Sequence, residues 1–151
     1  MAAVFTKRMF EKGQVIMREG ELEMVMYDII IGSVGIYINY GTDAEQLVDT
    51  VSDGDFFGEM ELINARARTA TVVALEKTEC LVIDKDTFGD YIRNYPEKCL
   101  AIMQSLSDKL RRTNAAYREM CQIAREAEAE GSEEVKKSGW LKRLLGIANE
   151  E

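Results

Sequence analysis

The hydrophobic pattern of the first ninety residues predicts β structure. Short apolar runs rich in Val, Ile, Tyr and Thr alternate with turns that contain Gly, Asp, Ser or Thr. The predicted strands cover residues 15–18, 26–31, 35–40, 47–51, 69–75 and 80–83. Because these runs are closely spaced and no long helix separates them, we expect antiparallel hairpins in a sandwich or barrel.

The pattern changes to helical spacing near residue 84. Asp86-Thr87 predicts an N-cap before a helix over 88–93, and Pro96 predicts the start of a second, long helix. Spacings of three and four then alternate along Met103, Leu106, Leu110, Thr113, Tyr117, Met120 and Ala124. This heptad seam favours pairing with a partner helix, because it is longer than a small β core could cover. Packing on the protein's own β portion is the alternative.

The end of the chain carries two charge blocks. An acidic run over 126–134 is followed by a short basic amphipathic segment over 136–147, centred on Trp140. Such segments lie on anionic membranes or dock in a groove of a partner protein. We favour a solvated or self-docking tail, because the neighbouring acidic run weakens attraction to lipid. The predicted division is a domain over 1–118 and an extension over 119–151.

Composition narrows the functional classes. The 151 residues suffice for one domain, and 27 acidic against 19 basic residues give a net charge of -8, which disfavours a free-standing nucleic-acid binder. Histidine is absent, which excludes Ser-His and Cys-His catalysis and most zinc sites. Cys80, Cys99 and Cys121 form no CxxC pair, so we expect reduced thiols in a cytoplasmic protein. No apolar run approaches the ~18 residues of a membrane span.

Residues 54–74 carry the candidate chemistry. Glycine-containing turns lead into a short apolar helix, predicted over 60–64, whose unpaired backbone N–H groups favour an anion. Arg68 stands just before a strand of small and β-branched residues, where a guanidinium can grip a phosphate with two hydrogen bonds. Glu59 offers a charged acceptor whose natural partner is a hydroxyl pair or an arginine.

This segment resembles the phosphate-binding cassette of the cyclic nucleotide-binding domain family. The family pattern Phe-Gly-Glu-hydrophobic-small-hydrophobic corresponds to residues 57–62, and Arg-small-Ala-Thr/Ser-Val corresponds to 68–72. Flanking strands and the hairpin over 27–37 agree, so the resemblance covers about residues 8–118. It implies an α+β fold: an antiparallel double-stranded β-helix, or jelly-roll-like β-roll, with a short cassette helix and a long C-terminal helix.

The resemblance also implies roles for single residues. Arg68 would pair with the exocyclic oxygens of the cyclic phosphate, and Glu59 would accept a hydrogen bond from the ribose 2'-hydroxyl. Gly58 would allow close backbone approach to the sugar, and Thr69 would touch the phosphate or a guanine base. Met60 belongs to the same cassette.

On the long helix, the activator branch of the family uses a Thr-Ser pair to contact adenine. Alignment on Leu110 brings Thr113 and Asn114 to that pair, which fits the polar interruption of the seam. The alternative is that this interruption only sets the register of the helix.

Glu61 departs from the family pattern, which usually has Ala, Ser, Gly or Cys at this position. A carboxylate pointing inward, about 5 Å from the phosphate, would repel it by roughly 3 kcal/mol at an effective dielectric near 20. That is about a hundredfold loss of affinity. The side chain could instead turn to solvent, pair with Arg66, or pair with Arg68 and mimic the ligand.

We therefore expect a sensor module, similar to a stand-alone bacterial family member, that binds cAMP or cGMP and signals through the long helix. A homodimer through that helix, and no direct DNA binding, are part of this expectation, since a winged-helix reader is missing. The alternative is a family member that no longer binds nucleotide and acts as a dimeric interaction or scaffold protein. An enzyme is not expected, because paired carboxylates and metal-ligand spacing are lacking.

Overall fold

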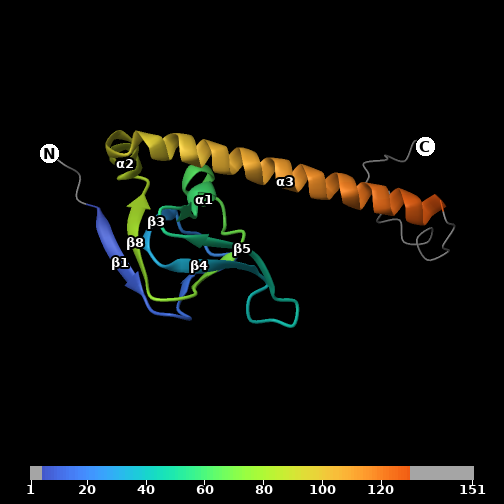
Figure 1. The fold of residues 1–151 in the computed structure, drawn as a ribbon, viewed down its shortest axis with the longest axis horizontal. Helices are drawn as coiled ribbons and strands as arrows, with labels where there is room; N and C mark the ends of the chain where they lie inside the picture. Colours follow the sequence, from blue (N-terminus) through green and yellow to red (C-terminus); the bar gives the residue numbers. More distant parts are fainter. Residues whose placement is uncertain (1–4, 130–151) are drawn as a thin grey trace. The chain divides into compact units, whose positions relative to one another are not determined.

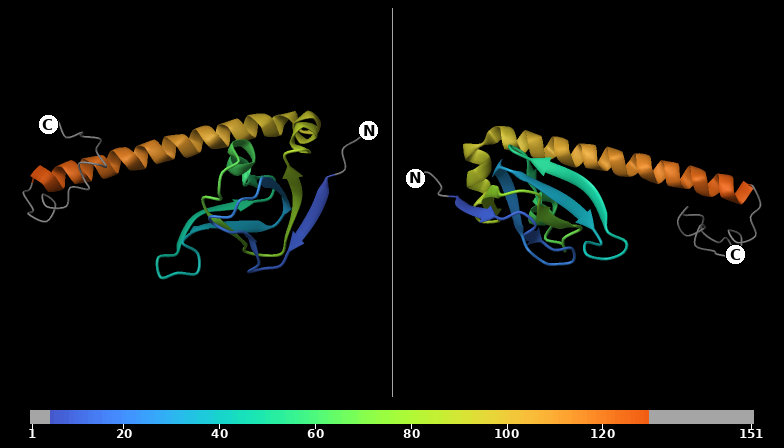
Figure 2. Two further views of the ribbon diagram at one scale, coloured as in Figure 1. Left: turned by 180° about the vertical axis from the view of Figure 1, so that it is seen from behind. Right: turned by 60° about the horizontal axis from the view of Figure 1, so that its bottom comes forward.

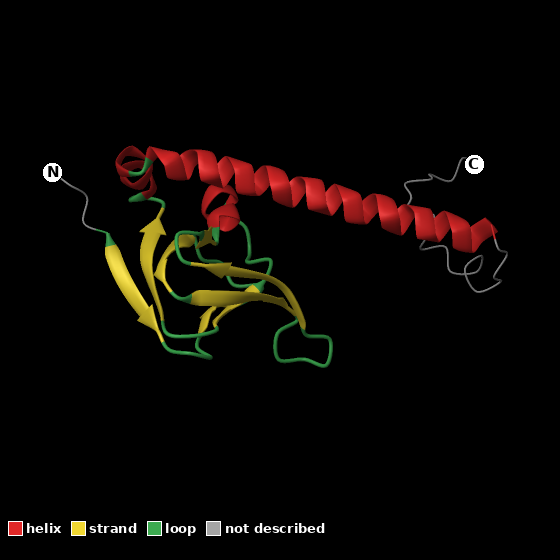
Figure 3. Ribbon diagram, in the orientation of Figure 1, coloured by secondary structure: helices red, strands yellow, loops and turns green. Residues whose placement is uncertain are grey.

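The computed structural model describes residues 5–129. The chain forms two compact units, Met1–Cys99 and Leu100–Glu151. The first unit contains all the described strands and two short helices, and the second contains most of a long helix (Figure 3). The predicted boundary between residues 118 and 119 stays a prediction.

Eight strands of the first unit form two four-stranded antiparallel sheets (Figures 1 and 2). The strands are β1 (Thr6–Phe10), β2 (Val15–Met17), β3 (Val25–Ile31), β4 (Ser33–Ile38), β5 (Gln46–Ser52), β6 (Phe56–Phe57), β7 (Thr71–Ala74) and β8 (Thr78–Asp84). The strand orders are β1-β8-β3-β6 and β2-β7-β4-β5. The predicted β-roll is therefore confirmed.

One hydrophobic core joins the two sheets. Tyr27 and Ile29 from the first sheet meet Val34 and Val72 from the second in a single cluster of buried side chains. Tyr27 stacks on Phe57 with ring centroids 5.2 Å apart. This packing anchors β6, and so fixes the point from which the cassette starts.

Strands β1 and β6 were not among the strands predicted from hydrophobic runs. Strand β1 lies at the edge of its sheet, where of its five residues only Phe10 is buried. Strand β6 has only two residues. Neither offers the run of alternating apolar residues that such a prediction needs.

Three helices complete the described chain: α1 (Glu59–Asn64), α2 (Phe88–Asn94) and α3 (Pro96–Ala129). Thr87 is the N-cap residue of α2 as predicted, but its side chain does not cap the helix. Its hydroxyl instead donates to Asp84 Oδ1 at 2.8 Å. Backbone and side-chain hydrogen bonds from Thr87 lower the pKa of Asp84.

The seam of α3 keeps much of its apolar surface exposed. Met103, Leu110, Tyr117 and Met120 are all exposed, whereas Ala124 is buried. The hydroxyl of Thr113 donates to the Lys109 carbonyl oxygen at 2.9 Å, a common way for a helical threonine to satisfy its hydroxyl.

Two sequence predictions meet the limits of the described chain. The basic segment over 136–147 and most of the acidic run lie outside the described residues. Over residues 5–129, no helix is long and apolar enough to cross a membrane.

Candidate functional site

The candidate site begins at Gly58, between β6 and α1. Gly58 has a φ of 81°, in the left-handed region that side chains rarely adopt. A Cβ here would lie 2.3 Å from Met17 Cε and 2.9 Å from Arg68 Nη1. The left-handed backbone conformation therefore favours glycine here, and an added Cβ would also displace the ends of the Met17 and Arg68 side chains.

Arg68 occupies a buried position with an unusual set of partners. Its Nη1 donates to the Gly58 carbonyl oxygen at 3.2 Å, and its Nη2 donates to the Val25 carbonyl oxygen in a short hydrogen bond. Its backbone N–H donates to the Glu21 carbonyl oxygen at 2.8 Å, which fixes the residue just before β7. The guanidinium Nε is buried and has no hydrogen-bond partner within residues 5–129.

Glu61 points toward Arg68, which is one of the three orientations that the sequence left open. Its Oε2 accepts a hydrogen bond from Arg68 Nη1 at 3.1 Å. Its Oε1 accepts from the Thr69 backbone N–H at 3.4 Å and from the Thr69 hydroxyl at 3.3 Å, both long and therefore weaker. The Glu61 side chain is only 7% exposed. We call Glu61, Arg68 and Thr69 the Glu61 cluster.

A second carboxylate also approaches the guanidinium. Glu23 Oε2 lies 3.7 Å from Arg68 Nη2, and the Glu23 side chain is 41% exposed, so water screens this ion pair. Arg68 therefore faces two carboxylates, one buried and hydrogen-bonded, the other exposed and more distant. The positive charge of the site is already compensated by the chain itself.

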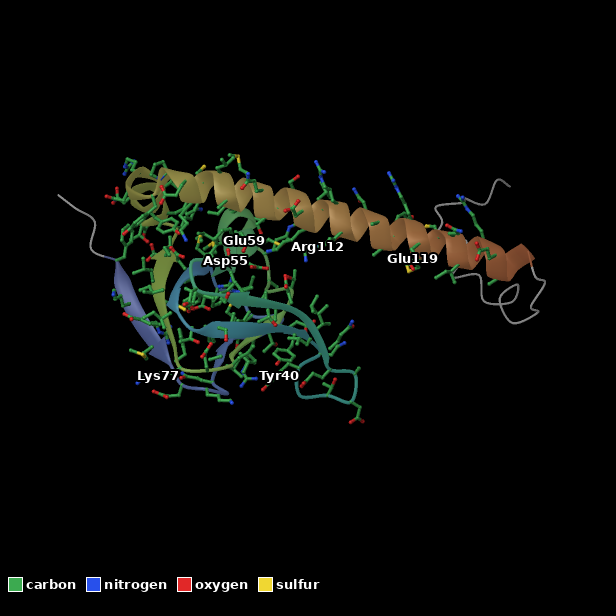
Figure 4. The ribbon with its side chains drawn as sticks, viewed as in Figure 1. Tyr40, Asp55, Glu59, Lys77, Arg112 and Glu119 are labelled. Atoms are coloured by element: carbon green, nitrogen blue, oxygen red, sulfur yellow. The ribbon has the colours of Figure 1, made fainter. Side chains whose placement is uncertain are left out.

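Hydrogen bonds bring together four of the predicted site residues: Gly58, Glu61, Arg68 and Thr69. Glu59 is fully buried as the first residue of α1 (Figure 4). Met60 is 36% exposed.

Thr113 and Asn114 lie on α3 in the second unit, so their contact with a base stays a prediction. Sequence reasoning missed the Val25 carbonyl and Glu23. A backbone acceptor leaves no mark in a sequence, and one glutamate in an acidic stretch carries no motif.

The first unit holds another buried carboxylate, Asp28 on β3. Its Oδ2 accepts from the Tyr91 hydroxyl and its Oδ1 from Lys98 Nζ, both at 2.8 Å. Lys98 also donates to the Gly54 carbonyl oxygen at 2.6 Å. Burial and the hydrogen bond to Asp28 raise the pKa of Tyr91. We call Asp28, Tyr91 and Lys98 the Asp28 cluster; it ties α2 and the first turn of α3 to the sheet.

Within residues 5–129, no group of three or more Cys, Asp and Glu side chains could hold a metal ion. Arg68 and Thr69 supply the donors that an anion needs, namely a buried guanidinium, a backbone N–H and a hydroxyl, and in this structure the Glu61 carboxylate accepts from them.

Comparison with known proteins agrees with the family resemblance found in the sequence. The model of the cyclic nucleotide-binding domain family matches residues 7–95, which include seven of the eight described strands in full, all but the first residue of β1, and the Glu61 cluster with Gly58 and Glu59. The chain is 36% identical over 90 residues to human cGMP-dependent protein kinase 2, covering 58% of this chain and 12% of the kinase. It is 28% identical over 107 residues to the cyclic AMP receptor protein of Thermus thermophilus, covering 71% of this chain and 50% of the receptor.

The fold is also found in solved structures. The catabolite activator protein of Thermus thermophilus superimposes with a TM-score of 0.65 at 22% identity, covering 94% of this chain and 72% of that chain. The chain spans half or less of the length of the two relatives above, so their whole-protein activities do not transfer with the match.

Proposed function

The chain belongs to the cyclic nucleotide-binding domain family, and on that premise we propose that it is a regulatory module that binds a cyclic nucleotide and catalyses no reaction. The observation that carries this proposal is the incomplete hydrogen bonding of Arg68. A buried guanidinium N–H without an acceptor is costly, and such a group in a native structure calls for an explanation. A bound phosphate would supply the missing acceptor.

The ligand phosphate would displace the Glu61 carboxylate and lie against the Arg68 guanidinium, where it can also reach Nε. There its oxygens would accept from the Arg68 guanidinium and from the Thr69 backbone N–H, the donors that Glu61 uses in the described structure. Charge-assisted hydrogen bonds of this kind are about twice as strong as neutral ones.

The ribose would meet Glu59. This carboxylate is fully buried at the start of α1, and in the proposed complex it accepts a hydrogen bond from the 2'-hydroxyl. A 2'-deoxy analogue cannot make that hydrogen bond, so it should bind more weakly. The relatives named above include a cGMP-dependent kinase and a cyclic AMP receptor, so both nucleotides are candidate ligands.

Signalling would pass through α3. This helix has 34 residues and exposes Met103, Leu110, Tyr117 and Met120 at heptad positions. We propose that the seam pairs with the same seam of a second copy, since a sustained heptad pattern is typical of helix pairing. The nucleotide would act by binding one arrangement of the dimer more tightly than another.

Calorimetric titration with cAMP and cGMP tests the proposal. The variants are Glu61→Ala and the double variant Glu61→Ala/Arg68→Ala, because removing Arg68 alone would leave the Glu61 carboxylate buried without its cation. We expect one-site binding by Glu61→Ala and a loss of about 100-fold or more in the double variant. Equal binding by the two variants would contradict a phosphate role for Arg68.

The pairing of Glu61 with Arg68 also favours a second candidate function, a nucleotide-independent interaction protein. In that case the internal ion pair is the permanent state of the site, and the dimer is the functional form. This candidate predicts that millimolar cAMP or cGMP leaves the thermal midpoint unchanged in both the wild type and Glu61→Ala. A rise in the midpoint with nucleotide would count against it directly.

A further inference from the structure

The Glu61 carboxylate accepts hydrogen bonds from Arg68 and Thr69, as the phosphate of a ligand would. One carboxylate oxygen meets Arg68 and the other meets Thr69, so the two oxygens divide between the guanidinium and the backbone N–H with its neighbouring hydroxyl. The side chain is 7% exposed and the Arg68 side chain is 1% exposed. Water therefore screens this ion pair little, and an incoming phosphate finds its principal cation already engaged.

We propose that the Glu61 carboxylate is a built-in anion that occupies the Arg68 site and sets the nucleotide concentration at which the module responds. The inference rests on the proposed function, and it adds an internal competitor to it. Two anions cannot share the same donors without strong repulsion, so the phosphate binds only after Glu61 has left Arg68. The nucleotide therefore binds only those protein molecules in which Glu61 does not contact Arg68, which we call the open state.

The internal anion imitates a phosphate incompletely, which is why it can be displaced. The carboxylate leaves Arg68 Nε without an acceptor, and its contacts to Thr69 are 3.3 and 3.4 Å long. A phosphate brings more oxygens than a carboxylate and can supply the missing acceptor. The exchange therefore replaces three contacts, two of them long, by a more complete set.

The size of the effect follows from the fraction of open molecules. If the site is open in about 1% of molecules, the apparent Kd is about 100-fold higher than the intrinsic value. Truncation of Glu61 removes that penalty. The module would thus respond to a higher nucleotide concentration than the same site with alanine at this position.

Glu23 provides a matched control. Its removal changes the net charge by the same amount as removal of Glu61, and its carboxylate also faces Arg68, at 3.7 Å. The Glu23 side chain is 41% exposed and its carboxylate lies beyond hydrogen-bond distance of Arg68, so Glu23→Ala should alter affinity by less than about threefold. Glu61→Gln separates charge from size, because the amide keeps the length of the side chain and loses the charge.

The experiment is calorimetric titration of the wild type, Glu61→Ala, Glu61→Gln and Glu23→Ala with cAMP and with cGMP, with the thermal midpoint of each ligand-free variant measured in parallel. We expect Glu61→Ala to bind about 100-fold more tightly than the wild type, with Glu61→Gln between them.

Four outcomes would overturn the inference. Equal affinities of the wild type and Glu61→Ala would overturn it and leave the proposed function intact. An equal gain in Glu23→Ala would show general charge repulsion instead of an internal ligand. Wild-type-like binding by Glu61→Gln would show that bulk, not charge, excludes the phosphate. Absence of binding in every variant would overturn the inference and the proposed function together.

Discussion

The Asp28 and Glu61 clusters contain similar groups and differ in how completely those groups are paired. Each has a buried carboxylate, a cation and a hydroxyl. In the Asp28 cluster the hydrogen bonds from Tyr91 and Lys98 are both 2.8 Å long. In the Glu61 cluster two hydrogen bonds are longer than 3.2 Å, and Arg68 Nε has no partner in the described chain.

This difference distinguishes buried charged groups that stabilise the fold from buried charged groups that can bind a ligand. Tight, mutual hydrogen bonding leaves nothing for a ligand to improve, and it joins β3 to α2 and to the start of α3. Where the hydrogen bonds around a buried cation are long or incomplete, an anion that makes more complete hydrogen bonds can bind with a favourable free energy. Substitutions in the Asp28 cluster should therefore change only the stability of the fold, whereas substitutions in the Glu61 cluster should also change ligand binding.

The largest expected effect is on the Asp28 cluster. Asp28→Ala should lower the free energy of unfolding by about 3 kcal/mol, because Tyr91 and Lys98 lose a shared buried acceptor. Urea unfolding measures this loss, and saturating nucleotide should not recover it. The matched control is Glu79→Ala, whose ion pair with Lys7 is partly exposed, with the Lys7 side chain 59% and the Glu79 side chain 25% exposed, and should contribute less than about 1 kcal/mol. A loss of stability no greater than that of Glu79→Ala would contradict the claim that the Asp28 cluster stabilises the fold.

Gly58→Ala should have the next largest effect. The added Cβ meets Met17 and Arg68 and also requires a left-handed backbone, so we expect a loss of about 2 to 3 kcal/mol together with weaker nucleotide binding. Gly13→Ala is the control, because Gly13 has nearly the same φ, +82°, and nothing within 4 Å of its Cβ position. It should lose about 1 kcal/mol and keep its affinity. Equal losses in the two variants would show that close approach to Arg68 is unimportant.

Glu61→Ala should destabilise the ligand-free protein by only about 1 to 2 kcal/mol, since Arg68 keeps its two carbonyl acceptors. Unlike the loss from Asp28→Ala, this loss should be recovered by cAMP or cGMP, because a ligand that binds only the folded state stabilises it. Thermal melts with and without nucleotide measure the recovery. If the midpoint of Glu61→Ala failed to rise with nucleotide, the two clusters would not differ in the way described.

The smallest expected effect concerns Cys80. Burial, and then the charges of Asp28 and Glu79, raise the pKa of the Cys80 thiol to about 12. Because the thiolate is the reactive form, Cys80 should stay unmodified at pH 8, while Cys99 and Cys121, which are partly exposed, react. Mass spectrometry after brief alkylation distinguishes the three. Modification of Cys80 at the rate of the other two would contradict a closed core beside Asp28.

The apolar runs predict antiparallel hairpins in a sandwich or barrel, and the resemblance to the family, carried by a motif of fixed spacing, implies the β-roll, the cassette and Arg68. Strands β3, β4, β5, β7 and β8 follow apolar runs, and Arg68 belongs to a motif with fixed spacing. The sequence leaves the orientation of Glu61 open, because a rotamer depends on which donors the fold brings near. Those donors come from Arg68 and Thr69, seven and eight residues away.

The Asp28 cluster was beyond prediction for a similar reason. Its members are separated by 63 and 70 positions in the sequence, and only the packed fold brings them together. Neither Tyr91 nor Lys98 stands in a motif. A buried aspartate in a strand gives a hint that a partner exists, but it does not say which residue supplies it.

The most direct test of the central claim is a crystal structure of the wild-type protein grown with saturating cAMP or cGMP. We expect a phosphate on Arg68, with an oxygen within hydrogen-bond distance of Nε, and a Glu61 side chain rotated away from the guanidinium. A Glu61 carboxylate still bonded to Arg68, with nucleotide bound elsewhere or absent from Arg68, would contradict it.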